Sequence, residues 1–262
     1  MKRIRTIKAV KYITPLREGG SLPAIIEGDD EALYAMKFKG AGQGKKALIA
    51  ELIAGEIARY LGFNVPEIVF VELNPVIGRT EPDPEIQDLL KASAGLNIAL
   101  RYLSQASSFN LFVSPKLSVE FASRLVWFDA FVTNIDRTPK NVNMLIQNNK
   151  IWLIDHGASL IFHHNWNDHL QQSCNPFKMI RDHVLLPLSR DIHAIDKMIK
   201  RQFDDITFRK IVDSIPNEWL EPNQLFTHAQ QLKDAYVEYL SYRLENSSIF
   251  VEEANRARTN LV

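Results

Sequence analysis

Two short stretches in the middle of the chain carry oxygen-bearing side chains at spacings that suit metal-dependent chemistry. Asp136 and Asn141 lie five residues apart in one polar segment, and Asp155 follows an apolar run and stands directly before a His-Gly pair. The two segments adjoin the two strands of a predicted hairpin. We therefore expect their side chains to lie close together at one end of that hairpin. A carboxylate and an amide oxygen without a thiol suit Mg²⁺ or Mn²⁺ rather than zinc. The second carboxylate is then free to take a proton.

This spacing is the one that a phosphoryl-transfer loop needs. In protein kinases one Asp orients or deprotonates the acceptor hydroxyl, while an Asn five residues later and an Asp before a glycine hold the metal ions. Applied to this chain, Asp136 is the predicted base, and Asn141 and Asp155 are the predicted metal ligands. The predicted chemistry is therefore transfer of a phosphoryl group to a hydroxyl.

The motifs resemble those of the protein-kinase-like superfamily, and within it the HipA-like serine/threonine kinases. The residues that carry the resemblance are Asn134-x-Asp136-x-x-x-Lys140-Asn141-x-Asn143, Asp155-His156-Gly157, the strand Met36-Lys37-Phe38, and the helix from Ala50-Glu51-Leu52 to Leu61-Gly62. The resemblance covers most of the chain between about residues 15 and 160. The usual His-Arg-Asp and Asp-Phe-Gly triplets are altered, but the acid and the metal ligands are retained.

The resemblance implies an ATP- and Mg²⁺-dependent kinase that binds the nucleotide between two lobes and phosphorylates a Ser or Thr of a protein. In that arrangement Lys37 reaches the α- and β-phosphates and is held by Glu51. Lys140 either neutralises charge on the transferred group or is a solvated loop cation. The other implied nucleotide contacts are the turn Gly19, Gly20 and Ser21 over the phosphates and the hinge Arg101, Tyr102 and Leu103 beside adenine. Ser21 is either a site of self-phosphorylation or a simple turn residue.

Several neighbouring residues compete for these roles. Lys39 lies on the same strand face as Lys37, and we prefer Lys37 because Lys39 abuts a glycine turn. Glu51 and Glu56 are five residues apart, about 140° around a helix, so both cannot face one lysine. Glu56 is then expected at the surface. The Asp/His-rich run 155–169 lacks a helical metal-binding pair, and its imidazoles are expected at the surface near the rim of the site.

The elements that must position these residues divide the chain into a β-rich part and a helical part. In the first part we predict strands at 4–13, 23–27, 32–39, 67–73 and 96–103, a strong amphipathic helix at 45–61, and a polar insert with one short helix at 78–95. In the second part we predict helices at 117–132, 192–202, 205–215 and 224–245, and a hairpin of 144–147 with 151–154. The expected fold class is α+β. Together with the resemblance, this predicts a bilobal protein-kinase-like fold with a β-rich N-terminal lobe (1–104) and a helical C-terminal lobe (105–262).

The amino-acid composition restricts the classes of protein to which this chain can belong. The 262 residues are 46% hydrophobic and 24% charged, the balance of an ordinary globular protein rather than of a disordered or fibrous one. The 31 basic residues equal the 31 acidic ones, so we expect no direct nucleic-acid binding. A single cysteine, Cys174, cannot form an internal disulfide or a Cys-rich zinc site. Because no apolar run is long enough to span a membrane, we expect a cytoplasmic protein.

Two other functions fit the same residues. A small-molecule or lipid kinase shares the spacing of Asp136 and Asn141, since the surface of the helical part chooses the acceptor. A catalytically silent kinase-like binding module is suggested by the altered triplets. The sequence leaves the acceptor open.

Overall fold

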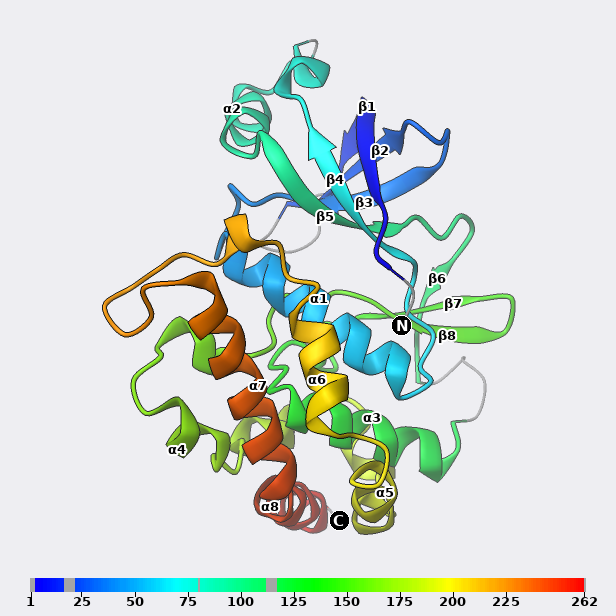
Figure 1. Cartoon of the computed structure of the whole chain (residues 1–262). Helices are drawn as coiled ribbons and strands as arrows, with labels where there is room; N and C mark the ends of the chain where they lie inside the picture. The colour runs from blue at the N-terminus through cyan, green and yellow to red at the C-terminus, as the bar shows by residue number, and fades with distance from the viewer. Residues whose placement is uncertain (1–2, 17–21, 80, 112–116, 262) are drawn as a thin grey trace.

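The computed structural model describes residues 3–16, 22–79, 81–111 and 117–261 (Figure 1). A small β-barrel forms the N-terminal part, a mainly helical assembly forms the C-terminal part, and helix α1 (Lys45–Tyr60) lies between them. The α+β class predicted from the sequence is therefore confirmed. No helix in the described ranges has both the length and the apolar composition needed to cross a membrane.

Five strands close the N-terminal barrel in the order β1-β2-β3-β5-β4. They are β1 (Thr6–Pro15), β2 (Ala24–Gly28), β3 (Leu33–Lys37), β4 (Ile68–Leu73) and β5 (Gly95–Arg101). All neighbouring pairs are antiparallel except β1 with β4, whose parallel pairing closes the barrel. Between β4 and β5 lie a 3₁₀ turn, η1 (Pro75–Gly78), and the short helix α2 (Pro84–Ala92) of the predicted insert.

The alternation of side chains along β3 decides which of its residues can do chemistry. Tyr34 and Met36 point into the barrel and form part of its core. Successive side chains of a strand point to opposite faces, so Lys37 points outward, toward α1. The same alternation places Val69 of β4 in the barrel core and Ile68 in the larger core that contains α1.

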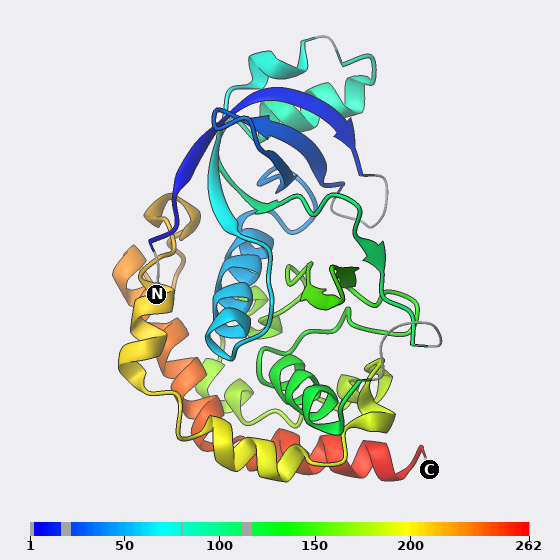
Figure 2. The same cartoon turned by 90° about the vertical axis from the view of Figure 1, so that its right-hand side faces the viewer.

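Helix α1 is buried between the barrel and the C-terminal helices (Figure 2). Every residue from Leu48 to Ala58 is buried, because one face packs on the barrel and another on α6 (Asp205–Val212). The expectation that Glu56 lies at the surface is therefore wrong. Its carboxylate is buried beside Arg59, with a separation of 2.7 Å between Oε1 and the guanidinium, and burial raises the pKa of Glu56.

The C-terminal part surrounds helix α3 (Val119–Phe131), most of whose residues are buried. The other helices are α4 (His169–Ser173), α5 (Ile192–Ile199), α6, α7 (Ala229–Glu245) and α8 (Ser248–Thr259), with 3₁₀ turns η2 (Ile161–His164), η3 (Lys178–Asp182), η4 (Leu186–Leu188) and η5 (Asn217–Trp219). A small sheet of β6 (Ser107–Ser108), β7 (Met144–Gln147) and β8 (Lys150–Leu153) lies beside them. The predicted hairpin is thus confirmed, and it lies directly after the polar segment of residues 134–143.

The helices of the C-terminal part differ from the prediction at α7, α4 and α8. Helix α7 begins at Ala229 rather than at 224, because the Asn223 carboxamide accepts from the Leu225 and Phe226 amides and folds this stretch into a turn. Helices α4 and α8 are absent from the prediction. Helix α4 has only five residues, and the buried face of α8 includes the small residues Ala254 and Ala257, which give a weak hydrophobic signal in the sequence.

Candidate active site

The ammonium group of Lys37 lies between two carboxylates that come from different segments. It forms an ion pair with Glu51 of α1, and its Nζ is 2.5 Å from Oδ1 of Asp155, which follows β8. Glu51 is wholly buried and Lys37 is only 8% exposed, whereas the side chain of Asp155 is 35% exposed. The structure therefore brings together three predicted site residues, and it selects Glu51 over Glu56 as the partner of Lys37.

Lys37 and Glu51 each stabilise the charged form of the other. Burial alone lowers the pKa of Lys37, but the negative charges of Glu51 and Asp155 outweigh it, so the pKa lies above its usual value. Burial likewise raises the pKa of Glu51, while the Lys37 charge and hydrogen bonds from His156 outweigh it and leave the pKa well below normal. At neutral pH the pair is therefore ionised, and a fixed positive charge lies at the edge of the barrel.

His156 ties helix α1 to the segment that carries Asp155. Its backbone N–H donates to Glu51 Oε2 at 2.9 Å, and its Nδ1 lies 3.3 Å from Glu51 Oε1. The expectation that the imidazoles of this run are at the surface is wrong for His156 and for His163, which are both fully buried. His156 is buried because it bonds to Glu51. His163 Nδ1 lies 2.9 Å from the hydroxyl of buried Tyr236.

Gly157 completes this segment for a steric reason. A Cβ at this position would lie 3.2 Å from Lys37 Nζ, closer than most side-chain contacts allow. The glycine therefore leaves room for the ammonium group. Asp155 itself has a backbone φ of 55°, in the left-handed region that few aspartates adopt, so its carboxylate is directed by a specific local conformation.

The loop of residues 134–143 holds the predicted base. Oδ2 of Asp136 accepts hydrogen bonds from the side-chain amides of Asn141 at 2.8 Å and Asn143 at 3.1 Å. The Asn143 carbonyl in turn accepts from the backbone N–H of Ile154 at 3.1 Å, next to Asp155. The two predicted segments therefore meet in the folded chain.

A buried polar network beneath this loop was missed in the sequence. Asp129 of α3 is fully buried and binds Arg137 Nε at 2.6 Å, His183 Nε2 at 2.9 Å and the Asn134 side chain at 2.8 Å. Burial raises the pKa of Asp129, but Arg137 and His183 outweigh it and lower the pKa to about 2. The available signal was the carboxylate inside the apolar run of residues 125–132, because such a charge requires partners.

The remaining predicted residues are placed as follows. Lys140 is exposed at the tip of the loop. The Arg101 guanidinium lies over the ring of Tyr34, 5.6 Å from its centroid, and the Tyr102 backbone N–H donates to the Leu33 carbonyl at 2.8 Å. Leu103 is partly buried just beyond them. The turn Gly19, Gly20 and Ser21 lies outside the described residues.

The donor set fits the predicted metal. Among residues 3–16, 22–79, 81–111 and 117–261, no three His, Cys, Asp or Glu side chains converge on a metal-binding geometry. The predicted ligands are one carboxylate and one amide oxygen, from Asp155 and Asn141. Mg²⁺ is commonly held by one or two carboxylates together with substrate phosphates and water, so these two residues suit it. The Asn141 amide donates its N–H to Asp136, which leaves its oxygen for a cation.

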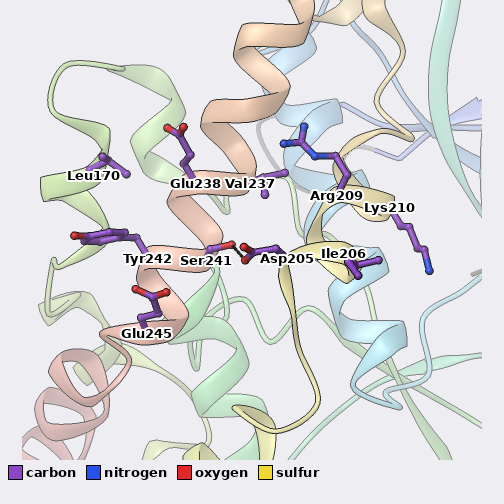
Figure 3. Close-up of a pocket in the computed structure, with 10 residues that line it drawn as sticks. All are labelled: Leu170, Asp205, Ile206, Arg209, Lys210, Val237, Glu238, Ser241, Tyr242 and Glu245. Atoms are coloured by element: carbon purple, nitrogen blue, oxygen red, sulfur yellow. Dashed lines mark hydrogen bonds between the residues drawn. The ribbon is translucent and has the colours of Figure 1, made fainter.

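A separate groove lies on the C-terminal part between α4, α6 and α7 (Figure 3). It has a volume of about 810 Å³, and its lining includes Ile206, Arg209 and Tyr242. Within it the Ser241 hydroxyl donates to Asp205 at 2.6 Å. None of the predicted site residues lines this groove, so it is separate from the candidate active site.

Comparison with known proteins agrees with this geometry. A family model described as HipA-like kinase matches residues 9–251. The crystal structure of the Helicobacter pylori proinflammatory kinase CtkA is similar in fold, with a TM-score of 0.53 and 14% sequence identity, covering 98% of this chain and 100% of that one. A search of curated proteins finds no match. Because the family match covers most of its length, the chain belongs to the HipA-like kinase family.

Proposed function

We propose that this protein is an ATP- and Mg²⁺-dependent phosphotransferase that transfers the γ-phosphoryl group of ATP to a hydroxyl, that of a Ser or Thr in a protein. The observation that carries the proposal is the buried ammonium of Lys37, held by Glu51 and Asp155 from two other segments. A buried cation fixed by a helix glutamate is the arrangement with which kinases position the phosphates of ATP.

In this proposal Lys37 contacts the α- and β-phosphates. The phosphates then compete with Asp155 for the ammonium, since both are anionic, and Asp155 becomes available as a metal ligand. Asp155 and the Asn141 amide oxygen would hold Mg²⁺, which would neutralise charge on the phosphates. Glu51, wholly buried and also bound to His156, keeps Lys37 in place during this exchange.

Asp136 is the proposed base. The hydrogen bonds from Asn141 and Asn143 both reach Oδ2, which leaves Oδ1 to orient the acceptor hydroxyl. As the acceptor oxygen forms its bond to the γ-phosphorus, the bond to the β-phosphate oxygen breaks and ADP leaves. The hydroxyl proton passes to Asp136. Exposed Lys140 is positioned on the same loop to offset the negative charge of the transferred group.

We further propose that residues 1–104 and 105–262 are the two lobes, with Arg101, Tyr102 and Leu103 as the hinge beside adenine. The family membership supports this division, because the barrel ends with β5 at Arg101 and the helical part follows. Gly19, Gly20 and Ser21 would cover the phosphates from the turn between β1 and β2.

Incubation of the full chain with γ-labelled ATP and Mg²⁺ tests the activity. We expect ATP turnover or self-labelling, and a loss of roughly 100-fold or more in Asp136→Asn, since a general base contributes about 10²–10⁴ to the rate. Asp182→Asn, which alters an exposed carboxylate at the end of η3, is the matched control and is expected to keep full activity. Absence of nucleotide binding, turnover and labelling in the unaltered protein would contradict the proposal.

The same assay identifies the acceptor class. Ser- and Thr-containing peptides and a set of hydroxylated metabolites are offered in parallel, with labelled ATP and Mg²⁺. We expect label in peptides. Label only in metabolites would identify a small-molecule kinase, and ATP binding without any transfer would identify a silent binding module.

A further inference from the structure

We infer that Asp129 and Asn134 are positioning residues for Asp136, acting through a closed ring of buried hydrogen bonds beneath residues 134–143. This inference rests on the proposed function, because it assumes that Asp136 is the base. It concerns a different part of the molecule, since neither Asp129 nor Asn134 contacts the Lys37 cluster. The ring runs from Asp129 through Asn134, Asp136, Asn143 and Arg137 and returns to Asp129.

The first half of the ring fixes the backbone of Asp136. Oδ1 of Asp129 accepts from the Asn134 side-chain amide at 2.8 Å, and the oxygen of that same amide accepts from the Asp136 backbone N–H at 3.0 Å. The Asn134 backbone N–H also donates to the Asp129 carbonyl at 2.8 Å. The position of the Asp136 main chain is therefore set from helix α3.

The second half fixes the carboxylate of Asp136. Oδ2 of Asp129 accepts from Arg137 Nε at 2.6 Å, and another nitrogen of Arg137 donates to the Asn143 carbonyl at 2.5 Å. The Asn143 side chain then donates to Oδ2 of Asp136 at 3.1 Å. The backbone and the side chain of Asp136 are thus both linked, through hydrogen bonds, to the carboxylate of Asp129.

Most of the ring is shielded from water. Asp129, Asn134, Arg137 and Asn143 are buried, and Asp136 is partly buried. Hydrogen bonds in such surroundings are stronger than in water and reinforce one another, while an unpaired member is costly. His183 donates to Asp129 as a third partner and keeps its carboxylate fully paired.

The backbone supports a positioning role as well. Thr133 and Asn143 have φ values of 53° and 45°, in the left-handed region that non-glycine residues rarely adopt. Such conformations persist only where the surroundings hold them. Because these residues flank the loop, the ring holds it in a shape that the isolated segment would not favour.

Replacement of Asn134 tests the inference in the full-length chain. Asn134→Ala removes the hydrogen bonds that the Asn134 side chain makes with Asp129 and with the Asp136 backbone. It leaves the Asp129–Arg137 ion pair intact, so it is less disruptive than replacing Asp129. The matched control is Trp127→Phe, which removes another buried hydrogen bond of α3, from Trp127 Nε1 to Asp196 at 2.8 Å, away from the ring. Both variants are assayed for ATP turnover at the same interval below their own Tm.

We expect Asn134→Ala to lower kcat by roughly 10- to 100-fold, with little change in the KM for ATP, because misplacement of a catalytic group affects the chemical step. Trp127→Phe is expected to keep its kcat. Equal kcat values for the two variants, or a loss confined to KM, would overturn the inference.

A second readout separates this inference from the proposed function. Amide hydrogen exchange of Asp136 is expected to be about tenfold faster in Asn134→Ala than in the unaltered chain, since one hydrogen bond is lost, and unchanged in Trp127→Phe. If the unaltered protein shows no turnover, the proposed function fails and this exchange rate alone decides whether the ring exists. Equal exchange rates in both variants would refute the ring.

Discussion

The Lys37–Glu51 ion pair is expected to contribute both to the stability of the fold and to ATP binding. Substitutions can separate these two contributions. Lys37→Met leaves the fully buried carboxylate of Glu51 without its cation, which we expect to cost about 3–5 kcal/mol of the free energy of unfolding. Replacing both residues, as Lys37→Met with Glu51→Met, removes the uncompensated charge and should regain much of that loss. Urea unfolding measures the stability, and neither variant is expected to bind ATP productively. A double variant no more stable than Lys37→Met would contradict this account.

The buried imidazole of His163 predicts how stability depends on pH. Burial holds the pKa of His163 well below its usual 6.5, so in acid the unfolded chain binds a proton that the folded chain does not. The contribution is therefore present above pH 6.5 and is lost as the pH falls below that value, with a slope of up to about 1.4 kcal/mol per pH unit. His183 acts in the same direction, since burial lowers its pKa too.

Unfolding measured in urea between pH 8 and pH 5 tests the contribution of His163. We expect His163→Gln to flatten the fall in the free energy of unfolding, because the substituted side chain does not titrate. His193→Gln, at a half-exposed position, is the control and should leave the slope unchanged. A slope equal to that of the unaltered protein in His163→Gln would contradict the prediction.

At the residue scale, spacing in the sequence indicated Asp136, Asn141, Asp155 and Lys37 as candidate site residues, but it could not describe their surroundings. The alternation of β3 placed Lys37 opposite the barrel core, and the 140° offset excluded one of the two glutamates. That offset could not show that α1 is buried on all sides, which is why Glu56 was wrongly expected at the surface. His156 was wrongly expected at the surface for a related reason, because it packs against Glu51 of this buried helix.

At the scale of elements, the end of α3 is held by a cation from α7. The wholly buried guanidinium of Arg243 donates to the Ala130 and Phe131 carbonyls, both at 2.7 Å, and to those of Ser173 and Asn175 at 2.8 and 3.0 Å. The last carbonyls of a helix lack partners within it and carry its partial negative charge. Arg243 therefore caps α3 just before the loop of residues 134–143.

This cap predicts that a lysine cannot replace Arg243. The ammonium of Arg243→Lys is a compact charge and cannot reach the two groups of carbonyls as the planar guanidinium does. We expect a loss of about 2–3 kcal/mol in the free energy of unfolding, measured in urea. Arg256→Lys, at an exposed position on α8, is the control and should change stability by less than about 0.5 kcal/mol. Equal stabilities would show that the four carbonyl contacts contribute little.

The elements themselves were largely readable from the sequence. The strands and the hairpin follow from alternation and turn residues, and α1 follows from its apolar spacing and the Gly62 stop. The exceptions have local or weak signals: the turn at Asn223 that shortens α7, the five-residue helix α4, and α8, whose buried face includes two alanines. In each case contacts between side chains and backbone, or between helices, decided the outcome.

At the scale of the whole molecule, nucleotide and metal should act as a bridge between the two parts of the chain. Lys37 belongs to the barrel, Asp155 and Asn141 to the C-terminal part, and α1 packs on both. A ligand at 100 times its Kd stabilises a protein by about 2.7 kcal/mol, so ATP with Mg²⁺ should raise the Tm of the unaltered chain. Asp155→Asn is expected to abolish the part of this shift that depends on Mg²⁺.

Differential scanning fluorimetry with ATP, with and without Mg²⁺, measures that difference. Asp168→Asn, an exposed acid in the same His-rich run, serves as the control and should retain the full Mg²⁺-dependent shift. An unaltered Mg²⁺ effect in Asp155→Asn would remove Asp155 from the metal site.

The sequence by itself determined the α+β class and the resemblance to HipA-like kinases, and it supplied the candidate site residues, because the proposed chemistry constrains which side chains occur and how far apart they lie along one segment. Tertiary structure alone decided which groups support them. Arg137 lies eight residues from its partner Asp129, but His183 lies 54 residues from Asp129 and Arg243 lies 112 residues from Phe131. Their roles depend on buried hydrogen bonds whose partners no local spacing specifies. A charge within an apolar helix signals that a partner must exist, but only the folded packing shows which residue it is.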